Sequence, residues 1–125
     1  MKPSIEDLSS DEVQRALRPI VSLMNKSEKA RQKLARRTWQ HAMLRDNLKA
    51  LSIASALMRN DPRAARCATR NDLEDAVRAV VSMADRTEKA QAKFSPGTSQ
   101  YSLQRNRLRA LQIAEVLVRA ELDES

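Results

Sequence analysis

The chain has 125 residues, a length that suits a single domain, and its apolar fraction of 42% argues against intrinsic disorder. Aromatic residues make up only 2% and glycine occurs once, so strand-rich folds with many tight turns are disfavoured and an aliphatic core is expected. The net charge of +7 favours a nucleic-acid or acidic partner, and the excess lies in residues 11–70, with fourteen lysines and arginines against five acids.

The first predicted element is an amphipathic helix that begins near Asp11. Asp11 followed by Gln14 has the pattern of a capping box, and Ser9 followed by Glu12 is a competing start two residues earlier. Beyond the cap, apolar residues recur at alternating spacings of four and three, which predicts a helix with one buried face. These residues are Val13, Leu17, Ile20 and Met24.

A second helix is predicted after Thr38, which is a natural N-cap. Its apolar positions are Met43, Leu48, Leu51, Ala54, Leu57 and Met58. It is expected to end before Pro62, because the residue ahead of a proline is pushed out of the α region. Residues 11–61 therefore form a predicted helical hairpin, and residues 62–70 a linker.

Residues 71–121 repeat this hairpin at a shift of 60 positions without a gap, and 18 of the 51 aligned positions are identical. Asn71 with Glu74 is the matching capping pair. The segment 95–97, Ser-Pro-Gly, breaks the helix before Thr98, the N-cap predicted for the last helix. The sequence therefore predicts a tandem duplication of one helical hairpin with a 60-residue repeat.

The predicted fold is all-α, an up-down-up-down four-helix bundle that forms a single domain over residues 1–125. One hairpin alone leaves its apolar stripe exposed, and the second hairpin covers it. Homodimerisation and exchange of hairpins between chains stay open as alternatives. No stretch approaches the roughly 18 apolar residues of a membrane span, and the lone Cys67 cannot form an internal disulfide. A soluble, cytoplasmic protein without a membrane partner is therefore expected.

No pattern in the sequence predicts catalysis, and we expect no catalytic residue, metal ligand or cofactor. His41 is the only histidine, Cys67 the only thiol, and a single glycine excludes glycine-rich phosphate loops. The expectation is that the protein is not an enzyme. An arginine-lined pocket for an anionic small molecule between the helices stays open as a weaker alternative.

The candidate contact residues belong to the basic face and tip of the first hairpin: Lys26, Lys29, Lys33, Arg36, Arg37 and Trp39. The three lysines share one helical face, and the other residues crowd the turn. Basic residues beside an exposed aromatic can hold single-stranded nucleic acid. The simpler interpretation is a solvated charged face, with Trp39 closing the end of the core as a hydrophobic plug.

The second helices carry a parallel basic set, namely Arg45/Arg105, Lys49/Arg109 and Arg59/Arg119. Basic ridges of this kind can follow a phosphate backbone, although exposed helix faces are normally charged. The expected function is a non-enzymatic module that binds another protein, which no motif identifies. The alternative is a nucleic-acid-binding protein that uses the basic face and tip of the first hairpin.

Overall fold

The computed structural model describes residues 8–61, 63 and 67–124. Its long helices are α1 (Ser10–Gln32), α2 (Trp39–Met58), α4 (Arg70–Gln91) and α5 (Ser99–Glu124), and the described residues form no strand. The prediction of an all-α chain with four helices is confirmed. Among the described residues, no helix is both long enough and apolar enough to cross a membrane. Of the predicted linker 62–70, positions 62 and 64–66 lie outside the described residues.

Hydroxyl side chains cap the N-termini of the helices. The Thr38 and Thr98 caps are confirmed, since each side chain accepts a hydrogen bond of 3.2 Å from a backbone N–H three residues on. The caps predicted at Asp11 and Asn71 are wrong by two residues. Ser9 caps α1, as the competing start proposed, and Thr69 caps α4.

The earlier start of α4 has a local cause. The Thr69 hydroxyl accepts a 3.0 Å hydrogen bond from the N–H of Asp72, whose carboxylate accepts one of 3.0 Å from the N–H of Thr69. This reciprocal capping box satisfies two backbone donors that the helix itself leaves unpaired. Asn71 therefore lies within the first turn of the helix instead of capping it.

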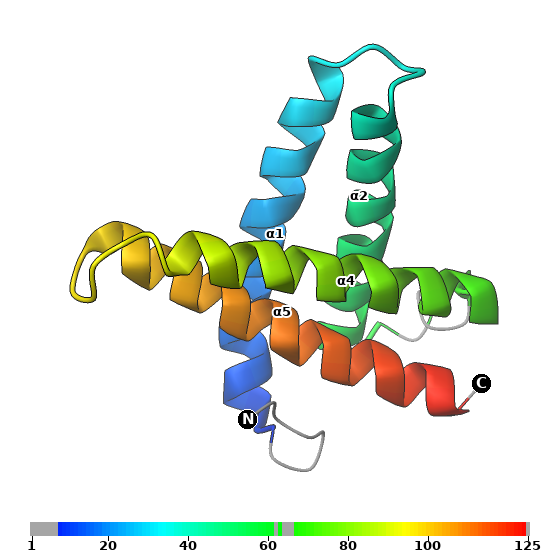
Figure 1. The fold of residues 1–125 in the computed structure, drawn as a ribbon. Coiled ribbons are helices and arrows are strands. Elements are labelled where there is room, and N and C mark those ends of the chain that lie inside the picture. Colours follow the sequence, from blue (N-terminus) through cyan, green and yellow to red (C-terminus); the bar gives the residue numbers. More distant parts are fainter. Residues whose placement is uncertain (1–7, 62, 64–66, 125) are drawn as a thin grey trace.

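The two hairpins cross instead of lying side by side. In Figure 1 α1 and α2 run in one direction, while α4 and α5 run across them. α1 packs on α2 and α5, and α2 packs on α4 and α5. The four axes are therefore not aligned as in the expected up-down-up-down order. A crossed arrangement suffices because buried residues are confined to one part of each helix, over 16–20, 47–58, 73–83 and 110–118.

The packing treats the hairpins as equivalent at a shift of 60 residues. The α1–α5 contact corresponds to the α2–α4 contact, and both exist. Matching buried pairs are Ala16/Ala76, Ile20/Val80, Ala50/Ala110, Leu51/Leu111, Ala54/Ala114 and Met58/Val118. Two ion pairs that join the hairpins correspond in the same way. Lys49 Nζ lies 2.6 Å from Asp72 Oδ1, and Arg109 Nη2 lies 2.8 Å from Glu12 Oε2.

Asp72 links this packing to pH. The hydrogen bond from Lys49, followed by that from the Thr69 N–H, lowers the pKa of Asp72 from 3.8 to about 2. The same contact with Asp72 raises the pKa of Lys49. A carboxyl whose pKa is lowered by folding adds stability above its unfolded pKa, and this stability is lost as pH falls through the folded value.

We therefore expect Asp72→Asn to lose less stability than the unchanged protein between about pH 4 and about pH 2. Asparagine keeps an oxygen that accepts from the Thr69 N–H, so the change tests the charge and spares the cap. The measurement is the free energy of unfolding in urea at each pH. Equal losses for the two proteins over this range would show that the Asp72 charge does not couple to folding.

Candidate binding groove between α1 and α5

The candidate residues of the first hairpin do not come together in one site. Lys26 and Lys29 are exposed on α1 and line a shallow hollow to which α5 contributes Arg107. Lys33 follows the last residue of α1 as its C-cap, and Arg36 and Arg37 lie exposed in the turn. The lysine face and the arginines of the turn are therefore separate surfaces.

Trp39 lies at the first position of α2, and 71% of its surface is exposed. The expectation that it closes the end of the core is therefore wrong. The α1–α2 turn projects away from the crossing in Figure 1, so the second hairpin does not cover this end. Trp39 instead lines a hollow between α2 and α4.

The basic set of the second helices is partly neutralised within the protein. Lys49 and Arg109 form the two ion pairs between hairpins. Arg119 Nε lies 2.9 Å from Glu115 Oε2, on a glutamate that is 5% exposed. Arg45 Nε lies 3.6 Å from Asp46 Oδ1. These residues therefore contribute to packing, and they do not form a continuous free ridge.

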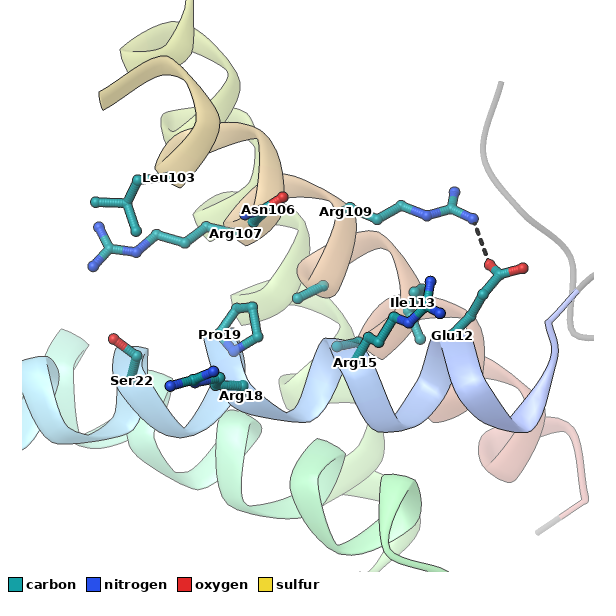
Figure 2. A pocket seen from close by; sticks show the side chains of 12 residues that line it. Glu12, Arg15, Arg18, Pro19, Ser22, Leu103, Asn106, Arg107, Arg109 and Ile113 are labelled. Atoms are coloured by element: carbon teal, nitrogen blue, oxygen red, sulfur yellow. Dashed lines mark hydrogen bonds and ion pairs between the residues drawn. The ribbon is translucent and has the colours of Figure 1, made fainter. Parts of the chain in front are cut away.

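A groove of about 610 Å³ lies between α1 and α5 (Figure 2). Its apolar lining consists of Ala16, Pro19, Leu103, Ala110 and Ile113. Leu103, at 46% exposed, offers a large side chain to an incoming partner. The polar lining consists of Glu12, Arg15, Arg18, Ser22, Asn106, Arg107 and Arg109.

The groove carries more positive charge than it neutralises. Four arginines line it with a single acid, and Arg109 is the one that pairs with Glu12. The side chains of Arg15, Arg18 and Arg107 form no ion pair or hydrogen bond with any described residue. Three guanidinium groups are therefore available beside apolar surface.

Arg107 is the most confined of these three. Its Nε is buried and has no hydrogen-bond partner in the described part of the chain. Figure 2 shows its side chain extending beside Leu103 at one end of the groove. A buried donor without a partner is unfavourable, and an oxygen atom of a ligand would satisfy it.

Pro19 adds a backbone acceptor. It lies inside α1 and lines the groove, projecting towards α5 in Figure 2. Because proline has no N–H, the carbonyl of Arg15 lacks its helical hydrogen bond four residues on. Both residues lie on the groove side of α1, so this carbonyl is open to a donor from a partner.

An equivalent groove of about 550 Å³ lies between α2 and α4. Of the 12 residues that line the α1–α5 groove, 11 have a counterpart 60 positions away that lines the α2–α4 groove. The two grooves are therefore built on the same positions of the two hairpins. They differ mainly in charge, since Arg15 corresponds to Asp75, Arg107 to Asn47, and Asn106 to Asp46.

The groove offers guanidinium donors and apolar surface, which is the chemistry of binding. Within residues 8–61, 63 and 67–124, no cluster of three His, Cys, Asp or Glu residues could hold a metal ion. Cys67 is exposed, and His41 is half-buried near the N-terminus of α2. Neither residue contributes to the groove.

Arg15, Arg18 and Arg107 were not among the residues predicted from sequence. A signal for two of them is present in the repeat, because Arg15/Asp75 and Asn47/Arg107 are aligned polar positions at which the charge changes. Comparison of the chain with protein-family models, with curated proteins and with solved structures found no match. The groove and its charges are therefore the basis for a functional proposal.

Proposed function

We propose that the protein is a non-catalytic interaction module that receives an acidic segment of a partner protein in the α1–α5 groove. The observation that carries this proposal is the set Arg15, Arg18 and Arg107, which lacks acidic partners among the described residues. A guanidinium group presents a planar fork of donors that fits a carboxylate in a bidentate way. Charge complementarity therefore favours aspartate and glutamate side chains as ligands.

The apolar lining favours a protein segment over a purely anionic ligand. Pro19, Ile113 and the half-exposed Leu103 lie among the arginines. A phosphate backbone would neutralise the arginines and leave this apolar surface in contact with water. An amphipathic segment would cover both, and arginine beside apolar side chains is typical of protein interfaces.

The proposal includes the tandem duplication of the hairpin. The matching core pairs, the two ion pairs between hairpins and the two grooves all correspond at a shift of 60 residues. This correspondence supports the duplication because unrelated hairpins have no reason to share register at so many positions. We also propose a cytoplasmic location, where a single exposed thiol such as Cys67 stays reduced.

The test uses a labelled amphipathic peptide that repeats Leu-Glu-Glu, with a Leu-Lys-Lys peptide for comparison. We expect the acidic peptide alone to bind, and Arg15→Asp to weaken binding about tenfold or more, since a hydrogen bond to a charged group contributes about 1.5–3 kcal/mol. Fluorescence anisotropy gives the dissociation constants. Arg105→Asp is the matched control, because it makes the same charge change at an exposed position of α5 outside the groove. Equal weakening by both variants would refute the assignment of the groove.

Nucleic acid is the second candidate, and the exposure of Trp39 favours it. The 71% exposed ring follows Arg36 and Arg37 in the chain, so charge and a stacking surface lie close together. A labelled single-stranded oligonucleotide in the same titration distinguishes the two functions. Binding that weakens steeply with salt, persists in Arg15→Asp and is lost on reversal of Arg36 and Arg37 would assign nucleic acid to the tip.

A further inference from the structure

The two equivalent grooves act as an internal comparison. They share the ion pair at one end, Glu12–Arg109 in one and Asp72–Lys49 in the other. They also share an arginine on the first helix of the hairpin, Arg18 in one groove and Arg78 in the other. The residues that differ between the grooves are therefore the ones that decide what each groove can bind.

The change between Arg15 and Asp75 alters two charges at once. In the α2–α4 groove, Asp75 forms an ion pair with Arg78, so this arginine is neutralised by its own helix. In the α1–α5 groove, the position of that acid is taken by Arg15. Arg15 therefore adds a cation and also leaves Arg18, the counterpart of Arg78, without the acid that would pair with it.

The change between Arg107 and Asn47 alters reach as well as charge. Asn47 is 7% exposed and lines the α2–α4 groove with a short, neutral side chain. Arg107 is longer, extends beside Leu103, and carries a buried Nε without a partner among the described residues (Figure 2). The α1–α5 groove thus holds a donor that no residue of the described part satisfies and that has no equivalent at Asn47.

We propose that Arg15 and Arg107 are the specificity determinants that make the α1–α5 groove, and not the α2–α4 groove, receive the acidic segment. This inference rests on the proposed function. It implies that one segment binds per chain, and that the α2–α4 groove has the same shape elements without the charges that select the ligand. Exchanging the residues at these two positions between the grooves should then move the site.

The experiment compares three variants with the unchanged protein, using the same Leu-Glu-Glu peptide. Arg15→Asp with Arg107→Asn installs the residues of the α2–α4 groove, and we expect binding to weaken at least tenfold. Asp75→Arg with Asn47→Arg installs the residues of the α1–α5 groove, and we expect a second binding site per chain. The variant with all four changes has the composition and net charge of the unchanged protein, and it should again bind one peptide. Isothermal titration calorimetry gives the number of sites.

Trp39 reports which groove is occupied, since it is the single tryptophan and lines only the α2–α4 groove. The peptide should leave tryptophan emission unchanged in the native protein and should shift it in the four-fold variant. A shift in the native protein would place the peptide in the wrong groove and overturn the inference. A second site that fails to form in a folded graft, as judged by circular dichroism, would also overturn it.

The two proposals fail in different ways. If the native protein does not bind the peptide, the proposed function fails. If the native protein binds one peptide and Arg15→Asp with Arg107→Asn binds it equally well, only the role of these two residues fails. The loss variant also keeps the inference testable if the graft does not fold, because it introduces only residues that the equivalent groove already accommodates.

Discussion

Replacing Leu51 by alanine is expected to lower the free energy of unfolding by about 3 kcal/mol, as measured by urea denaturation. Leu51 is fully buried in α2, the helix that packs against α1, α4 and α5. Truncation removes apolar contacts and leaves a cavity that atoms from several helices border. These helices cannot all move inward together, because the crossed hairpins are held by ion pairs as well as by the core.

Two controls belong to this prediction. Ser52→Ala changes the neighbouring, exposed residue, and its effect is expected to stay within about 0.5 kcal/mol. Leu111→Ala changes the counterpart in α5, which is also fully buried, so a loss similar to that of Leu51→Ala is expected. If Leu111→Ala produced two separate unfolding transitions, the two hairpins would not share one cooperative core.

Replacing Pro19 by alanine is expected to raise the free energy of unfolding by about 2 kcal/mol. A proline within a helix costs about 3 kcal/mol relative to alanine, and its restriction of the unfolded chain offsets up to about 1 kcal/mol of this. Pro19 lies in the middle of α1, while the matching position of α4 holds Ala79. Ala79→Pro is the reverse change, and a loss of similar size is expected from it.

The same variant connects stability with binding. If the open carbonyl of Arg15 accepts a hydrogen bond from the partner, Pro19→Ala removes that acceptor by restoring the helical bond. The variant should then be more stable and bind the acidic peptide more weakly, which is the usual cost of a strained functional position. Unchanged stability would show that α1 accommodates Pro19 without strain, and unchanged affinity would show that the carbonyl is not used.

Local features of the fold could be predicted from single stretches of sequence. The alternating spacing of Val13, Leu17 and Ile20 predicts the buried face of α1, and Ile20 is fully buried. The caps at Thr38 and Thr98 require only a hydroxyl side chain three residues ahead of a backbone donor. Where two caps competed, as at Ser9 and Asp11, the sequence contained both patterns, and the geometry of the first turn selected one.

The crossing of the hairpins and the exposure of Trp39 could not be predicted in the same way. An apolar stripe specifies which face of a helix is buried, but not which half of that face another hairpin covers. Burial within α2 runs from Asn47 to Met58, so the end that carries Trp39 is left without a partner. The plug interpretation assumed that the core extends along the whole hairpin, as in an aligned bundle.

The composition, the helices and the correspondence between the two halves follow from the order of residues along the chain, because each depends on neighbours within a few turns. The candidate site has another origin. Arg15 and Arg107 lie near opposite ends of the sequence and come together only because α1 packs on α5. Likewise, Lys49 and Arg109 look like free surface charge in the sequence, but ion pairs with the opposite hairpin occupy them. Charge that is available to a partner depends on long-range pairing, which a helix pattern does not contain.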